Sequence, residues 1–108
     1  MNWAWSQWTP ASKACRMAIG PGLYRLRREG TPGLLYVGQG NIAGRLRSHL
    51  VKAAQQGHRQ ATWFSGDVAA SWVALPGIRM VNLLENENDL IASHVLARGR
   101  GPWAQFLG

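Results

Sequence analysis

The sequence predicts an α+β domain in which helices pack on a small, largely antiparallel sheet. Short apolar or alternating runs at Leu23–Arg28, Leu34–Val37 and Ala70–Leu75 are typical of strands. Two longer segments, Asn41–Gln55 and Arg79–Ala97, repeat apolar residues at helical spacing. The order strand, strand, helix, strand, helix is typical of the α+β class.

The first half of the chain is expected to form a short helix and then a hairpin. The short helix is expected over Ser12–Ile19. The segment before it holds three of the six tryptophans, namely Trp3, Trp5 and Trp8. Glu29–Gly33 joins the first two strands as a five-residue turn with two glycines and a proline, so we expect these strands to pair antiparallel.

The second half is expected to alternate helices with irregular segments. Asn41 is the expected N-cap of the first long helix. Gly57–Asp67 is polar and predicts a loop, in which His58, Arg59 and Trp63 are candidate substrate contacts if it is more than a plain surface loop. After the last helix we expect a basic, glycine-rich exit and then a short extended tail over Pro102–Leu107.

Length and charge indicate one domain with a polyanionic partner. The 108 residues suffice for one modest core, so we expect a single domain over residues 1–108, with residues 1–19 as a tryptophan-rich N-terminal extension. Twelve Lys and Arg against five Asp and Glu give a net charge of +7, and ten of the twelve cations are Arg. Because the planar guanidinium suits phosphate oxygens, this excess favours a nucleic acid.

Other features exclude several classes. The single cysteine, Cys15, excludes an intramolecular disulfide and a zinc site built mainly from thiolates, and we expect it to be a small packed residue. No segment approaches the roughly 18 apolar residues of a membrane span, and Met1–Pro10 does not read as a secretory signal. These observations predict a cytoplasmic protein without a membrane partner.

The last helix contains an unusual carboxylate. Its apolar residues share one arc of the helical wheel: Leu83, Leu84, Leu90, Ile91 and Val95. Glu87 falls inside this arc, whereas Glu85 and Asp89 fall on the opposite, solvated face. A carboxylate on a buried face is costly unless it meets a cation, a metal or hydrogen-bond donors. Glu87 therefore either pairs with an Arg or opens into a site as a metal ligand. His94, in the same arc, is expected to be a satisfied core histidine rather than a catalytic one.

The first long helix has a basic flank beside its apolar seam. Arg45 and His49 are four residues apart, so they lie side by side, and Lys52 is on the same flank. This flank is either a solvated edge or a phosphate clamp. Tyr24 and Tyr36 stand in neighbouring predicted strands close to Gly22 and Gly38, which suggests close approach of backbone or ligand.

These residues match a known family in order and type. Gly22-Leu23-Tyr24, followed after eleven residues by Tyr36-Val37-Gly38, resembles the paired tripeptides of the GIY-YIG nucleases. Arg45, His49 and Glu87 follow as in that family, and Leu84–Ile91 resembles the corresponding helix of excision-repair endonucleases. The resemblance spans Gly22 to Gln105.

The resemblance implies a three-stranded antiparallel sheet flanked by helices and an endonuclease that hydrolyses phosphodiester bonds, with DNA favoured over RNA. It implies that Glu87 binds one divalent ion, Mg²⁺ or Mn²⁺, and that Arg45 stabilises the transition state. Tyr24 and Tyr36 would line the attacking water, with Tyr24 preferred as general base, and His49 would assist as in the restriction-enzyme branch of the family.

A further group of residues is expected to bind substrate: Arg25, Arg27, Gly38, Gly40, Lys52 and Gln105. Arg25 and Arg27, together with Arg45, are expected to favour the phenolate form of the catalytic tyrosine. Gln105 stands where the family has an Asn, and the linker from Gly38 to Arg45 is one residue shorter than in the repair enzymes.

Two alternatives remain at the level of function. The first alternative to an endonuclease acting alone is an inactive nucleic-acid-binding module of this fold. The second is a catalytic subunit or effector whose specificity comes from a partner protein. The tryptophan-rich N-terminus would dock a protein partner or a second copy of the chain, stack on unpaired bases, or pack on the sheet.

Overall fold

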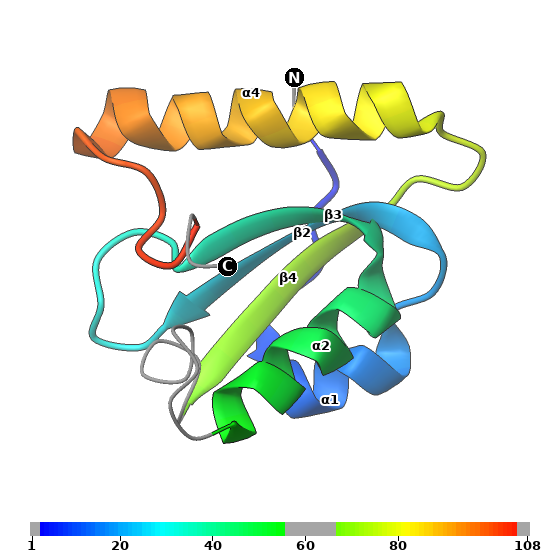
Figure 1. The fold of residues 1–108 in the computed structure, drawn as a ribbon, viewed down its shortest axis with the longest axis horizontal. Helices are drawn as coiled ribbons and strands as arrows, with labels where there is room; N and C mark the ends of the chain where they lie inside the picture. The colour runs from blue at the N-terminus through cyan, green and yellow to red at the C-terminus, as the bar shows by residue number, and fades with distance from the viewer. Residues whose placement is uncertain (1–2, 56–66, 106–108) are drawn as a thin grey trace.

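The computed structural model describes residues 3–55 and 67–105, so the expected contacts His58, Arg59 and Trp63 lie outside the described residues. The elements in chain order are β1 (Thr9–Pro10), α1 (Ala11–Met17), β2 (Pro21–Arg28), β3 (Tyr36–Asn41), α2 (Ile42–Ala54), β4 (Val68–Ala74) and α4 (Met80–Arg98). Helices α1 and α2 cover one face of the sheet and α4 crosses the other (Figure 1). The predicted α+β class is confirmed.

The sheet has four antiparallel strands in the order β1-β4-β2-β3, where three were expected. The additional strand, β1, pairs Thr9 with Ala70 and Pro10 with Ala69. Strand β2 is central, so Tyr24 lies opposite Gly38 on β3 and opposite Trp72 on β4. The segment expected as an extension therefore supplies a strand of the sheet, and α1 packs beneath it.

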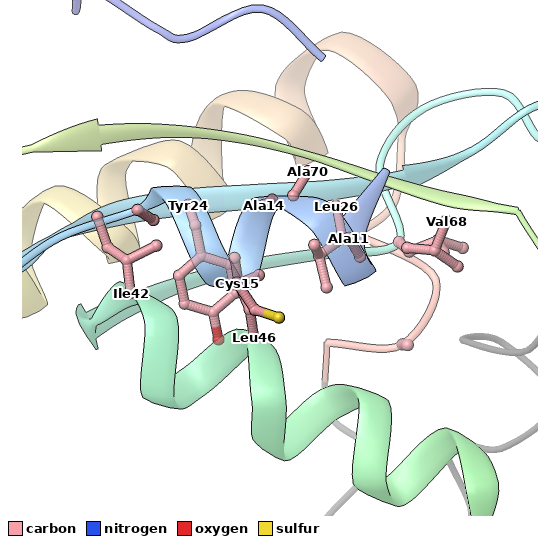
Figure 2. Close-up of a cluster of buried hydrophobic side chains, with 12 residues drawn as sticks. Ala11, Ala14, Cys15, Tyr24, Leu26, Ile42, Leu46, Val68 and Ala70 are labelled. Atoms are coloured by element: carbon pink, nitrogen blue, oxygen red, sulfur yellow. The ribbon is translucent and has the colours of Figure 1, made fainter. Parts of the chain in front are cut away.

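Alternation along β2 divides its side chains between two cores. Tyr24 and Leu26 face α1 and α2, where the buried cluster also includes Cys15 and Leu46 (Figure 2). Leu23 faces the other way and packs with Val73 and with Leu83 of α4. Trp3 and Trp5 pack against this second cluster, so two of the N-terminal tryptophans serve the core.

Several boundaries differ from the sequence expectation. Strand β3 spans Tyr36–Asn41, whereas the sequence predicted a strand over Leu34–Val37. In the described part of the expected extended tail the chain turns at Trp103–Gln105, because the Trp103 and Ala104 amides donate to the carbonyls of Leu34 and Leu35. The N-cap prediction is confirmed, since the Asn41 side chain accepts from the Gly44 amide at 2.9 Å.

His94 is a structural histidine that joins three segments. Its Nε2 accepts from the Leu34 amide at 3.0 Å, and its Nδ1 lies 2.7 Å from the Arg100 carbonyl. Since a carbonyl only accepts, Nδ1 carries the proton and the ring is neutral. The expectation of a satisfied core histidine is confirmed.

The buried stripe of α4 is narrower than its apolar arc. Leu83 and His94 are buried and Leu90 packs against the same cluster, whereas Leu84 and Val95 are 45% and 42% exposed. Only one edge of the arc faces the sheet, and Glu87 lies on that edge, half-buried.

Among the described residues, none of the helices is long and apolar enough to span a membrane.

Candidate active site

Two glycines make room for the tyrosine in the central strand. A Cβ on Gly38 would overlap the Tyr24 ring and hydroxyl, so the ring can cross beneath β3 only because this neighbour has no side chain. A Cβ on Gly22 would overlap the Val73 carbonyl of β4. The glycines of the two tripeptides thus hold the sheet tight around Tyr24, which is 1% exposed.

Helix α2 brings His49 to the hydroxyl of Tyr24. The Tyr24 Oη and His49 Nε2 atoms are 2.7 Å apart, and both side chains are buried. Figure 2 shows the Tyr24 hydroxyl pointing toward α2. Tyr36 completes the group, because its ring stacks on Tyr24 at 6.1 Å between centroids and meets the His49 ring edge-on at 4.5 Å.

Arg45 lies one turn before His49 on the same helix, and its side chain folds against the end of β3. An added Cβ on Gly40 would lie 3.2 Å from the Arg45 Nε, and Gly40 itself has a φ of 117°, which a side chain would strain. Gly40 therefore sets both the turn into α2 and the space for the guanidinium.

Glu87 reaches the same place from α4. A cavity of about 220 Å³ is lined by Tyr24, Tyr36, Gly38, Gln39, Arg45, Leu84 and Glu87. Of the five residues expected to be catalytic, four line this cavity and the fifth, His49, is hydrogen-bonded to one of them. Sequence reasoning missed Gln39 and Leu84; the position of Gln39 between two functional glycines was the available signal.

Burial and neighbouring charged groups shift the pKa values of the residues that line this cavity. Burial, and next the neighbouring Tyr36, raise the pKa of Tyr24 far above its ordinary value, while Arg45 acts to lower it. Burial and then Glu87 raise the pKa of Tyr36. Burial also raises the pKa of Glu87, against the opposing effect of Arg45. Tyr24 therefore remains a phenol at neutral pH.

The surroundings of Glu87 suit a hard divalent cation. Its half-buried carboxylate lines the cavity, and in the described part of the chain it makes no hydrogen bond and no ion pair within 4 Å. A carboxylate oxygen is a ligand that Mg²⁺ and Mn²⁺ accept, with water completing the coordination. Glu87 is the one acidic residue among the described residues that line the cavity, so it would be the single anionic ligand from this lining.

Of the six expected substrate contacts, Gly38 lines this cavity and the other five lie outside it. Arg25 and Arg27 alternate with Tyr24 along β2 and so project from the opposite face, where they stack on Trp5 and Trp8. The expectation that they favour the Tyr24 phenolate is therefore wrong. Lys52 is on the last turn of α2, about 10 Å along the helix from Arg45.

Gln105 has a different position from the one expected of a substrate ligand. Its Oε1 accepts from the Val37 amide and its Nε2 donates to the Val37 carbonyl, both at 2.8 Å, and the residue is 9% exposed. The side-chain amide thus holds the start of β3 in the manner of an additional strand. Gln105 positions the neighbours of Val37, which are Tyr36 and Gly38.

No family model and no curated protein matches the chain. Among solved structures, it is similar to the GIY-YIG N-terminal endonuclease domain of UvrC from Thermotoga maritima, a tyrosine-to-phenylalanine point mutant bound to its catalytic divalent cation. The TM-score is 0.55 at 18% sequence identity, over 78% of this chain and 88% of that chain. The chain therefore has the GIY-YIG nuclease fold.

Proposed function

We propose that this protein is a metal-dependent endonuclease that hydrolyses phosphodiester bonds of nucleic acid, with DNA as its preferred substrate. The observation that carries the proposal is the convergence of Tyr24, Tyr36, Arg45 and Glu87 around one cavity, with His49 hydrogen-bonded to Tyr24. The net charge of +7 supports a polyanionic substrate, and the similar solved domain is an endonuclease bound to a catalytic divalent cation.

Glu87 and Arg45 are the charged groups of the proposed site. Glu87 would hold one Mg²⁺ or Mn²⁺ ion, which supplies Lewis acidity to the phosphate oxygens when bound. Arg45 presents a planar fork with donors for two non-bridging oxygens. Because the guanidinium is in position before the substrate binds, Arg45 would stabilise the negative charge that develops on the phosphoryl oxygens in the transition state.

Tyr24 and His49 act together as the base. With the Nδ1–H tautomer of His49, Nε2 accepts the Tyr24 proton while Oη accepts a proton from the attacking water. The water oxygen forms its bond to phosphorus as the bond to the leaving oxygen breaks, and the leaving oxygen takes a proton from solvent. This relay needs no free phenolate, in keeping with the raised pKa of Tyr24.

The remaining contacts are assigned to substrate binding. Gly38 lines the cavity, Gly40 leaves the space for the Arg45 side chain at the end of β3, and Lys52 continues the basic flank of α2. An inactive binding module would have no use for a buried Tyr24–His49 pair beside a half-buried carboxylate. The site is therefore better explained by catalysis than by binding alone.

One assay tests the proposal. Purified protein is incubated with single- and double-stranded DNA and RNA, each with Mg²⁺, with Mn²⁺ and with EDTA, and Glu87→Gln is carried through the same reactions. We expect metal-dependent cleavage, fastest on DNA, that EDTA and Glu87→Gln both abolish. Cleavage that persists in EDTA, or in Glu87→Gln at the wild-type rate, would contradict the metal assignment.

A further inference from the structure

A second cavity of about 620 Å³ lies away from the candidate active site, at the end of β2. Trp8, Arg27 and Arg28 line it, together with the turn after β2 and the start of β4. It shares no described lining residue with the cavity that holds Tyr24 and Glu87. The proposed nuclease chemistry makes no use of it.

Aromatic and guanidinium groups stack in series beside this cavity. The Arg25 guanidinium lies over the Trp5 ring at 4.4 Å and over the Trp8 ring at 4.8 Å, and the Arg27 guanidinium lies over Trp8 at 4.1 Å. These contacts fix the orientation of Trp8 and Arg27 before any ligand binds. Arg27 is the exposed arginine of the series, and Trp8 is half-buried.

The charges of the cavity favour a neutral planar ligand over a bare phosphate. Arg27 and Arg28 are formally balanced by Glu29 and Asp67, which line the same space. The carboxylates accept hydrogen bonds and so suit the exocyclic amino groups of adenine, cytosine or guanine. The indole and the guanidinium offer flat surfaces of the kind on which nucleobases stack.

The volume of the cavity and the charges beside it further restrict the class of ligand that it can bind. The volume lies in the range of pockets that enclose a small organic ligand, so one nucleotide fits whereas a stacked duplex does not. Arg25 and Arg27 carry like charges on one face of β2, and the phosphates flanking a bound base would relieve their repulsion.

We infer that this cavity binds one unpaired base of a single-stranded nucleic acid, stacked against Arg27 and Trp8. The cavity shares no described lining residue with the candidate active site, so it would hold a strand segment that is not being cut. This binding does not depend on cleavage, and its failure is therefore distinguishable from failure of the proposed function.

Binding is measured by fluorescence anisotropy of labelled 12-nucleotide single strands and of a labelled duplex, all in EDTA. Arg27→Ala removes both the positive charge and the planar guanidinium group. Arg27→Lys keeps the positive charge but removes the planar group on which a base would stack. Arg16→Ala, an exposed position on α1, is the control for loss of one positive charge. Thermal melting of each variant verifies that it is folded.

We expect both Arg27 variants to weaken single-strand binding about tenfold, as for loss of one stacked base. Their duplex binding should fall no further than that of Arg16→Ala. Wild-type single-strand affinity in both Arg27 variants, or equal losses for single strand and duplex, would overturn the inference. So would competition by a free mononucleotide as strong as that of the oligonucleotide, or competition by inorganic phosphate alone.

Discussion

Gly38 lies directly opposite Tyr24 in the β2–β3 register, in the space that a side chain at this position would take from the Tyr24 ring and hydroxyl. The second tripeptide therefore serves the tyrosine of the first one. This relationship explains why the two tripeptides occur together: the glycine of one strand decides where the hydroxyl of the next strand points.

The first prediction is that Gly38→Ala removes activity through Tyr24. The added methyl group must displace the ring from His49, so we expect cleavage to fall at least tenfold and stability to fall by about 1–3 kcal/mol, as for an overpacked core. Gly77→Ala is the matched control, because its φ of 78° is strained but, apart from its chain neighbours, no described atom lies within 4 Å of the new Cβ. It should lose about 1 kcal/mol and keep its activity, as measured by chemical denaturation and cleavage assays.

Much of the candidate active site could be predicted from the sequence, because the patterns that indicate it lie within single helices and strands. The spacing of four between Arg45 and His49 fixes them on one side of α2, and the helical wheel separates Glu87 from Glu85 and Asp89. The reach of Tyr24 across to His49 is a tertiary contact, which no local pattern contains.

The errors also have physical causes. Strand β1 has only two residues, one of them Pro10, so it shows no alternation to detect. The glycines that end β3 resemble a turn, yet they lie in a strand because Tyr24 and Arg45 occupy the space above them. The assignment of Arg25 to the Tyr24 site ignored the alternation of β2, which was visible in the sequence.

A second prediction separates chemistry from binding on α2. Arg45→Ala should lower the rate of the chemical step by roughly 10²–10³-fold, because Arg45 lines the cavity beside Glu87. Lys52→Ala should leave single-turnover rates unchanged and reduce the salt dependence of binding by about one phosphate contact. If both variants change binding alone, Arg45 is a surface cation and its proposed role is wrong.

A third prediction concerns the pH dependence of Glu87. Its raised pKa means that the folded protein holds this proton to higher pH than an ordinary glutamate does, so metal affinity should fall on mild acidification. Arg45 lowers this pKa, so Arg45→Ala should move the loss of Mn²⁺ binding to higher pH. Calorimetric titration of Mn²⁺ across the acid range measures the shift directly, and an unchanged profile would contradict the coupling.

The raised pKa of Glu87 also affects the stability of the folded protein. Folding disfavours the ionised form, so the protonated carboxyl stabilises the fold at pH values below its ordinary pKa, and this contribution is lost as the pH rises through the folded value. Without metal at neutral pH, Glu87→Gln should therefore melt at the same or a slightly higher temperature than wild type. The exposed neighbours offer controls, since Glu85→Gln and Asp89→Asn should retain both metal binding and cleavage.

A fourth prediction tests Gln105 as a positioning residue. Gln105→Ala removes both hydrogen bonds to Val37 and leaves the buried Val37 amide and carbonyl without these partners, at a cost of about 1–3 kcal/mol. Gln105→Glu keeps the acceptor for the Val37 amide but loses the donor to its carbonyl, so it should rescue only part of the stability. Both variants should reduce the cleavage rate more than substrate affinity, and a pure loss of affinity would instead make Gln105 a substrate ligand.

The last prediction addresses the Tyr24–His49 pair. If the two residues form one relay, Tyr24→Phe and His49→Ala should each reduce cleavage by roughly 10²–10⁴-fold, and the double variant should be little worse than either single variant. Tyr36→Phe should be milder, because Tyr36 contacts the pair through its ring. Since its raised pKa keeps Tyr24 a phenol, the relay predicts no rise in rate toward about pH 10, where an ordinary phenol ionises. A rate that continues to climb toward pH 10 and loses that climb in Tyr24→Phe would identify a phenolate base without the relay. Additive losses in the double variant would mean that the 2.7 Å contact holds Tyr24 in place and carries no proton.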